Sequence, residues 1–139
     1  MEKFSSYQSH CFLGLGMALL VLAGGGCGAS DRGTVTGRVV HSDGTPLVLA
    51  RVIANCEGNS KTAFGSTDME GYYELTLDPE KQGIPPGTYS VYLIEDRGVV
   101  EGQMKRTIAK KYTDPHTSGL KFEVAAGERT VFDITAESP

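Results

Sequence analysis

Apolar and polar residues alternate along most of the chain after residue 33. In TVTGRVV, Val35, Gly37 and Val39 fall on one side of an extended segment, and two threonines and Arg38 fall on the other. A period of two is typical of half-buried strands rather than helices. The pattern therefore predicts a β-rich domain from the start of this run.

Further runs of the same kind follow, with glycine or proline at nearly every junction: LARVIANC, KTAFGST, GYYELTL, TYSVYLI, LKFEV and RTVFDITAE. They add up to about seven strands, and no segment has the period of an amphipathic helix. This arrangement predicts an all-β fold, an antiparallel β-sandwich of the immunoglobulin-like kind.

The alternation also predicts which side chains form the core. We expect the inward positions to include Val39, Val52, Leu75, Val91, Phe122 and Phe132. Cys56 falls on an inward position and is expected to behave as a small hydrophobic side chain. Ile53 breaks the alternation of its run, so we expect it at the surface.

The last two runs are separated only by AAGE, which predicts a hairpin. In that hairpin, Leu120, Phe122 and Val124 would face Phe132 and Ile134.

The N-terminal part differs from the rest. Cys11–Ala23 is uncharged and apolar, too short to cross a membrane comfortably but suited to the core of a secretory signal. The small residues GGGC that follow resemble the lipobox of bacterial lipoproteins, in which the cysteine receives the lipid. We therefore expect a signal peptide at 1–26, lipidation at Cys27 and a tether at 27–33, followed by the domain at 34–137. Ordinary signal cleavage nearby and an uncleaved anchor remain alternatives, since Gly24 stands where the lipobox pattern favours leucine.

Charge and cysteine content narrow the classes of function. The net charge is −4, and because residues 1–26 hold one lysine and one glutamate, all of it stays with the mature part. Nucleic acid is thus excluded as an expected partner, because phosphate binding needs a basic surface. With Cys11 in the signal and Cys27 lipidated, Cys56 has no partner for a disulfide.

The segment KYTDPHTSGL at Lys111–Leu120 concentrates polar residues between expected strands. Asp114, Thr117 and Ser118 can accept hydrogen bonds from nearby backbone amides. Pro115 restricts the backbone, Gly119 permits a turn, and Tyr112 can lie against the sandwich edge. We interpret the segment as a structural loop made of these six residues: Tyr112, Asp114, Pro115, Thr117, Ser118 and Gly119.

His116 lies within this loop and is the residue that a reaction or a metal would use. Neighbours in one loop rarely reach the geometry of a Ser/His/Asp arrangement, so we expect no catalysis. A metal site would have to join HSD at His41–Asp43 with DPH at Asp114–His116, and we expect neither a metal nor a cofactor. The basic residues Lys105, Arg106, Lys110 and Lys111 are interpreted as a solvated face, with anionic membrane headgroups as the alternative contact.

The order of short motifs resembles the carboxypeptidase regulatory-like domain. These motifs are V-x-G-x-V at Val35–Val39, DGTPL at Asp43–Leu47, A-x-V at Ala50–Val52, TDMEGYYEL at Thr67–Leu75 and PPGTYSVYL at Pro85–Leu93. The resemblance covers Gly33–Glu137 and implies a transthyretin-like (prealbumin-like) sandwich. IAKKYTDPHTSGLKFEV also resembles the ending of small bacterial lipoproteins of this type. The Tyr-Arg-Gly-Ser ending of the related hydroxyisourate hydrolase is absent, because the chain ends TAESP.

The resemblance implies a location in the cell envelope and does not imply an enzymatic reaction. We expect a non-catalytic lipoprotein module, exported and held to the membrane by its N-terminal lipid, that supports or contacts envelope proteins or polysaccharide. The alternative is a β-sandwich that binds a small carbohydrate, peptide or metabolite. Tyr72 and Tyr92, on the outward parity of their strands, are the aromatic residues available for such binding.

Overall fold

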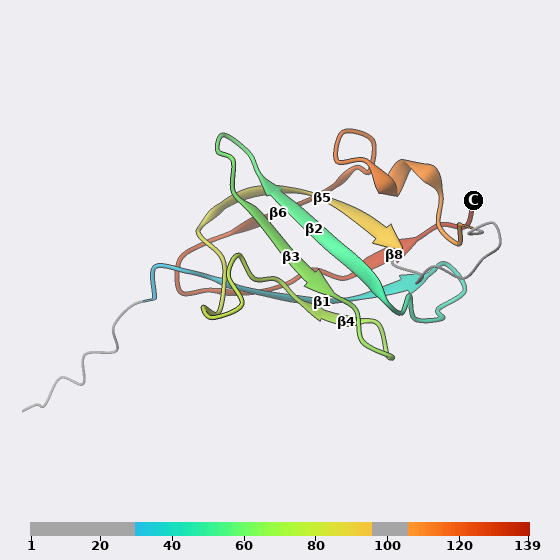
Figure 1. The fold of residues 1–139 in the computed structure, drawn as a ribbon, viewed down its shortest axis with the longest axis horizontal. Helices are drawn as coiled ribbons and strands as arrows, with labels where there is room; N and C mark the ends of the chain where they lie inside the picture. The colour runs from blue at the N-terminus through green and yellow to red at the C-terminus, as the bar shows by residue number, and fades with distance from the viewer. Residues whose placement is uncertain (1–29, 96–105) are drawn as a thin grey trace, which may run out of the picture.

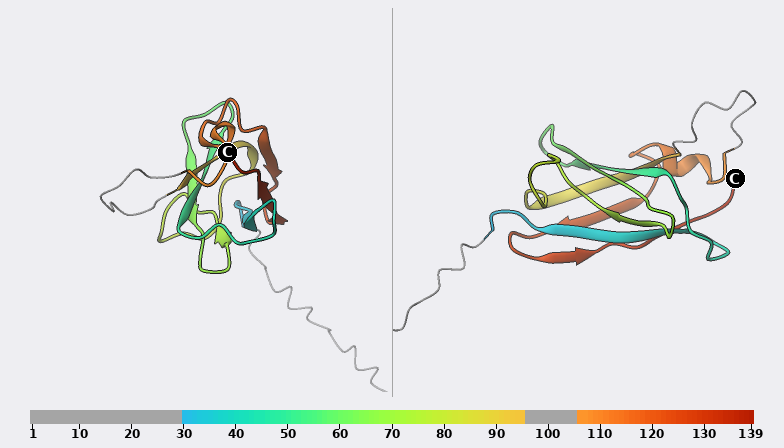
Figure 2. Two further views of the ribbon diagram at one scale, coloured as in Figure 1. Left: turned by 90° about the vertical axis from the view of Figure 1, so that its right-hand side faces the viewer. Right: turned by 60° about the horizontal axis from the view of Figure 1, so that its bottom comes forward.

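The structure is a computed structural model that describes residues 30–95 and 106–139. Within them lie eight strands and one short 3-10 helix, arranged as two sheets packed face to face (Figures 1 and 2). The elements are β1 (Thr34–His41), β2 (Ala50–Cys56), β3 (Thr62–Ser66), β4 (Tyr72–Glu74), β5 (Gly87–Glu95), η1 (Lys110–Thr113), β6 (Leu120–Val124), β7 (Arg129–Val131) and β8 (Ile134–Ala136). The predicted all-β sandwich is therefore confirmed.

The first sheet is centred on β1. Strand β4 pairs with one edge of β1 in antiparallel orientation, and β7 and β8 pair in succession with its other edge in parallel orientation. The final run was expected to be one strand, but it is interrupted at Phe132 and Asp133. There the Asp133 carboxylate accepts a hydrogen bond from the Arg38 amide at 2.9 Å, in place of a backbone carbonyl. This interruption is why eight strands appear where about seven were expected.

The second sheet has the order β3-β2-β5-β6, and every pairing in it is antiparallel. Its longest ladder joins β2 to β5, from Ala50 opposite Glu95 to Cys56 opposite Tyr89. Two backbone hydrogen bonds between Phe64 and Thr76 join this sheet to the segment that follows β4. The two sheets are thus connected at that edge.

The core lies between the sheets and is built from the inward positions that the alternation predicts. Five of the six expected core residues, namely Val39, Val52, Leu75, Val91 and Phe122, are buried, and Phe132 is partly buried against them. The ring of Phe122 stacks on Tyr89 with centroids 5.3 Å apart and lies 5.2 Å from the ring of Phe132. These three rings join the two sheets.

Two expectations are wrong. The runs after residue 119 do not form a hairpin, because β6 pairs with β5 in one sheet and β7 pairs with β1 in the other. The AAGE turn crosses between the layers, and Phe122 and Phe132 face each other across the core instead of along a ladder. Ile53 is not at the surface either: its side chain is 9% exposed, between Phe64 of β3 and Tyr92 of β5.

The two ends of the sandwich carry different loops. Gly33 is hydrogen-bonded to Ile84, and Arg32 accepts from Gly127, so the chain enters at the end that holds the turns after β4 and β6. The C-terminus lies at the opposite end (Figure 1). In the described ranges, no helix has the length and apolar character needed to cross a bilayer.

Candidate functional site

The segment 110–119, which we call the 110–119 loop, packs on the end of the second sheet. Its first turn is the helix η1, and Tyr112 in this turn is buried in the core cluster. The Lys111 ammonium group lies 5.0 Å from the centre of the Tyr112 ring and forms an ion pair with Glu137 at 2.8 Å. The hydrogen bond to Glu137 raises the pKa of Lys111. This turn is thereby joined to the C-terminal strand.

The side chains of Asp114, Thr117 and Ser118 hydrogen-bond to the backbone of the 110–119 loop or to β5. The Asp114 carboxylate accepts from the His116 amide at 2.8 Å, and the Thr117 hydroxyl donates to the Lys111 carbonyl at 2.8 Å. Ser118 is buried; its hydroxyl donates to the Val91 carbonyl at 2.5 Å and accepts from the Leu120 amide at 3.2 Å. Such contacts are what a structural loop requires of these residues.

The other members of the loop take the positions that a turn needs. Gly119 has a φ of 68°, in the left-handed region that favours glycine. Pro115 is partly buried, and His116 is exposed. His116 and Pro115 line a hollow of about 300 Å³ together with Glu57, Ser90 and Lys121.

The groups in this hollow do not form a nucleophilic arrangement. The Ser90 hydroxyl donates to Glu57 at 2.9 Å, and the Glu57 carboxylate also accepts from Lys121 at 2.6 Å. Both contacts lower the pKa of Glu57, that with Lys121 more than that with Ser90. Ser90 therefore donates a hydrogen bond to a carboxylate that is already paired with a cation and is too weak a base to activate a nucleophile.

The histidines that a metal would need line different hollows. His41 and Asp43 line a hollow with Arg106 and Thr107, whereas His116 lines the hollow beside β5 and β6. In the part of the chain that the structure describes, no three His, Cys, Asp or Glu side chains are grouped to hold a metal ion.

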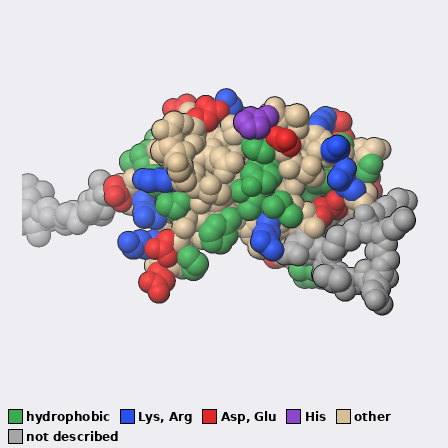
Figure 3. Space-filling view, turned by 45° about the horizontal axis from the view of Figure 1, so that its top comes forward, with side chains coloured by type: hydrophobic (Ala, Val, Ile, Leu, Met, Phe, Trp, Pro, Cys, Tyr) green, Lys and Arg blue, Asp and Glu red, His purple; other side chains and the backbone are tan. Residues whose placement is uncertain are grey.

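The remaining residues singled out in the sequence are Cys56 and the basic residues near position 110. Cys56 is buried, and its sulfur accepts a hydrogen bond from the Asn59 amide group at 3.1 Å. Of the basic residues, Arg106, Lys110 and Lys111 are exposed. On the face of the molecule that Figure 3 draws, lysine and arginine side chains are intermixed with aspartate and glutamate. The expected signal peptide at 1–26, the expected lipidation site Cys27 and the basic residue Lys105 lie outside the described residues.

A groove of about 770 Å³ lies on the outer face of the β4-β1-β7 sheet. We call it the β1 groove. Its floor has two rows of side chains that cross the strands. Pairing puts Thr36 of β1 between Glu74 of β4 and Val131 of β7 in the first row. In the second row, Arg38 lies between Tyr72 and Asp133.

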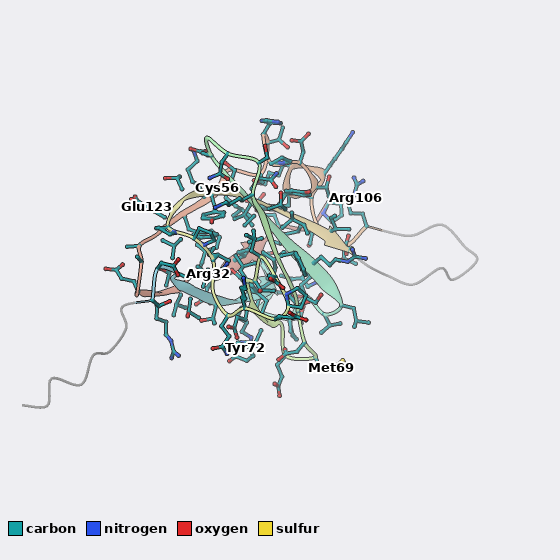
Figure 4. The ribbon with its side chains drawn as sticks, turned by 60° about the vertical axis from the view of Figure 1, so that its left-hand side comes forward. Arg32, Cys56, Met69, Tyr72, Arg106 and Glu123 are labelled. Atoms are coloured by element: carbon teal, nitrogen blue, oxygen red, sulfur yellow. The ribbon has the colours of Figure 1, made fainter. Side chains whose placement is uncertain are left out.

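Tyr72 is held in the wall of the β1 groove. The Asp68 carboxylate accepts from the Tyr72 amide at 2.9 Å, and the Arg38 guanidinium lies 5.3 Å from the centre of the Tyr72 ring. Arg38 is itself fixed by a 2.8 Å hydrogen bond from its Nε to the Glu70 carbonyl. Tyr72 nevertheless remains 53% exposed and Val131 66% exposed. Figure 4 shows Tyr72 and Met69 on one side of the molecule, with Cys56 and Glu123 on the other.

The β1 groove combines hydrogen-bond donors and acceptors around this ring. Within the described residues, the carboxylate of Glu74 and the second oxygen of Asp133 accept no hydrogen bond, and the terminal amino groups of Arg38 donate none. The phenol of Tyr73 donates from beneath the groove to the Phe132 carbonyl at 2.5 Å. Burial, followed by the nearby Asp133 charge, raises the pKa of Tyr73 and keeps the phenol protonated.

Sequence reasoning found Tyr72 as an outward aromatic residue but missed the groove. The outward parity of Thr36 and Arg38 is visible in the alternation. Their proximity to Val131 and Asp133 depends on the parallel pairing of β1 with the last strands. No local pattern indicates that pairing.

Comparisons with known proteins bear only on the fold. No protein-family model matches the chain, and no curated protein sequence matches it. Among solved structures, the chain is similar to the Bacillus anthracis TIE protein, with 21% identity and a TM-score of 0.50. The match covers 78% of this chain but only 17% of that one. At this identity the similarity shows a shared β-sandwich fold and says nothing about activity.

Proposed function

We propose that this chain is a non-catalytic, lipid-anchored module of the cell envelope, and that its β1 groove binds another macromolecule. One observation carries the proposal. An uncovered sheet face presents the exposed side chains of Tyr72 and Val131 beside Glu74, whose carboxylate accepts no hydrogen bond within the described residues. Exposed apolar side chains surrounded by polar groups are characteristic of interaction surfaces.

A catalytic role has less support. Ser118 is the serine of the 110–119 loop that could act as a nucleophile beside His116. Its side chain is buried, and its hydroxyl donates a hydrogen bond to a backbone carbonyl. Ser90 donates to a carboxylate that is paired with Lys121. The loop that contains His116 therefore serves, in this proposal, as a structural clamp made by Tyr112, Ser118 and the residues between them.

The place at which the described chain begins, next to Gly127, is compatible with the proposed anchor. Thr34 follows Cys27 by seven positions, and an extended chain of seven residues reaches at most about 25 Å. A lipid on Cys27 would hold the end of the sandwich that carries Arg32 and Gly127 near the membrane. The C-terminal end would then point away from the bilayer, and the side of the sandwich that carries the β1 groove would stay accessible to other envelope components.

We also propose that the domain is of the carboxypeptidase regulatory-like, transthyretin-like type. The motifs that carry the resemblance fall on β1, on β2, on β5 and on the turns between strands, in the order in which that family has them. This order supports the assignment more than any single motif does, because each motif consists largely of turn chemistry.

Crosslinking in the native envelope tests the proposed function. A photoreactive phenylalanine analogue would replace Val131 in the full-length, lipidated chain, and matched chains would carry it at Ile94. Ile94 is also exposed, at 41%, but lies on the outer face of the other sheet. We expect a discrete adduct from position 131 and none from position 94. Equal adducts at both positions, or none at position 131, would contradict the proposal.

A small-ligand role is the second candidate, because a volume of about 770 Å³ also suits a metabolite or a short oligomer. It uses the same groove and predicts direct binding by the purified chain. The crosslinked adduct separates the two, since a small metabolite would leave the mobility of the chain in gel electrophoresis almost unchanged.

A further inference from the structure

We propose that the β1 groove recognises an uncharged glycan chain. The inference rests on the binding role proposed above and names the ligand class. Its starting point is the arrangement of groups in the groove, where donors and acceptors alternate beside an exposed aromatic ring.

The second row of the groove is the most informative. Along it, the free oxygen of Asp133 is followed by the amino groups of Arg38 and then by the ring of Tyr72. A carboxylate only accepts hydrogen bonds and a guanidinium only donates them. A sugar hydroxyl does both, so adjacent hydroxyls of one sugar ring can donate to Asp133 and accept from Arg38. Hydrogen bonds to charged partners are the stronger kind.

The first row adds a hydroxyl, a carboxylate and an apolar side chain to the groove. The Thr36 hydroxyl lies in register between Glu74 and Val131. Glu74 adds a second acceptor, and the exposed side chain of Val131 adds apolar surface for the C–H groups of a sugar. Tyr72 supplies an amphipathic surface of the same kind from the adjacent row.

The charges of the groove disfavour anionic polymers and lysine-rich peptides as ligands. Among the described residues that line the groove, three are acidic (Asp68, Glu74 and Asp133) and one, Arg38, is basic. An excess of carboxylates repels phosphate-rich or uronate-rich chains. A lysine-rich peptide would be attracted to the carboxylates, but Arg38 lies between Asp133 and Tyr72 and would repel it at the centre of the groove.

The shape of the groove favours a chain over a single sugar. The groove crosses β7, β1 and β4 and continues to Ser66 and Asp68 beyond the edge of β4. It remains open to solvent, since Tyr72 and Val131 are both more than half exposed. A polymer can lie across such an open surface without inserting a free chain end. A protein held at the membrane could therefore bind the middle of a long chain.

Binding of the full-length chain in detergent to immobilised probes tests the inference. The probes are neutral oligosaccharides (hexamers of glucose in α and β linkage, of mannose and of N-acetylglucosamine), heparin and poly-L-lysine. We expect binding to at least one neutral hexamer and none to heparin. Tyr72→Ala should weaken that binding by about tenfold or more, as loss of an aromatic contact does. Tyr92→Ala, on the outer parity of the other sheet, is the matched control and should not change it.

Charge-removing variants of similar shape make the test specific. Glu74→Gln should weaken binding of the neutral hexamer because an amide is a poorer acceptor than a carboxylate, while the thermal unfolding of the chain stays unchanged. Binding of poly-L-lysine alone, lost in Glu74→Gln, would overturn the glycan assignment in favour of a basic peptide. Binding of no probe would also overturn it. In either case, a protein adduct from position 131 would leave the proposed macromolecule-binding function standing, and the absence of that adduct would remove both.

Discussion

Gly37 of β1 lies directly against the backbone of Phe132, so close that a Cβ atom at position 37 would be 2.0 Å from the Phe132 oxygen. The same carbonyl oxygen accepts the hydrogen bond of the Tyr73 phenol, and the Phe132 amide donates to the Thr36 carbonyl at 2.8 Å. The backbone at the interruption between β7 and β8 therefore packs against Gly37, and glycine fits there because it has no Cβ atom. The same interruption places Asp133 in the β1 groove.

A methyl group at position 37 should disrupt this contact. Because the obstructing atoms belong to the Phe132 backbone, they cannot rotate away, and we expect Gly37→Ala to lower the free energy of unfolding by about 3 kcal/mol. Urea denaturation of the purified chain measures this difference. Glu123→Ala, an exposed change on β6, should stay within about 0.5 kcal/mol and serves as the control. A loss for Gly37→Ala as small as the control would show that the strand can shift.

The contact between the Phe122 and Phe132 rings should couple the two sheets energetically. Phe122→Ala and Phe132→Ala should each cost about 3 to 5 kcal/mol, as removal of large core side chains usually does, with Phe132 at the lower end because it is only partly buried. The double variant should lose about 0.5 to 1.5 kcal/mol less stability than the sum of the two single losses. The reason is that the two rings contact each other, with centroids 5.2 Å apart, so each single variant already removes this contact. Strict additivity in chemical denaturation would contradict this contact.

The 110–119 loop should depend on Tyr112 and Ser118 and tolerate the loss of His116. Tyr112→Ala leaves a cavity and Ser118→Ala leaves the Val91 carbonyl without its partner, so both should lower the melting temperature clearly. Gly119→Val should also lower it, since a β-branched residue is strained at a φ of 68°. His116→Ala should change stability by no more than about 0.5 kcal/mol. A binding or hydrolytic activity lost in His116→Ala with the fold intact would refute the structural reading of the loop.

Alkaline pH should destabilise the domain through its buried tyrosines. Burial, followed by the neighbouring Cys56, raises the pKa of Tyr89 from 10.0 to about 12. As pH rises above 10, the unfolded chain loses this proton first, so the stability present below pH 10 is lost progressively up to about pH 12. Urea denaturation at a series of pH values should show this fall, and Tyr89→Phe should reduce its slope. Tyr89→Phe also removes the hydrogen bond to Pro85, which should cost about 1 kcal/mol at neutral pH. An unchanged slope would contradict the assignment to Tyr89.

The proposed lipidation at Cys27 can be tested by metabolic labelling. Clickable palmitate fed to the producing bacterium should label the wild-type chain and leave Cys27→Ala unlabelled, because only the thiol can form the thioether to the lipid. Cys56→Ala is the control and should label normally, since Cys56 is buried in the folded domain. Equal labelling of the wild type and Cys27→Ala would exclude this anchor.

The alternation of residues along the chain determined the all-β character of the protein and most of its core. Val39, Val52 and Leu75 were assigned inward from local parity alone, and they are buried. Parity succeeds because successive side chains of a strand must point to opposite faces. It failed at Ile53, whose outward position is covered by Phe64 and Tyr92 of the neighbouring strands.

Only the tertiary structure decided which strands pair. The short AAGE link between LKFEV and RTVFDITAE favours a hairpin locally, yet β6 and β7 lie in opposite sheets. Phe122 and Phe132 contact each other across the core, and burial of apolar surface between two sheets is a driving force that local turn preference does not include. The β1 groove follows from the same pairing, because Val131 and Asp133 reach Thr36 and Arg38 only when the last strands run parallel to β1. A local pattern determines the face on which a side chain lies, whereas its neighbours on that face depend on long-range contacts that the whole fold must stabilise together.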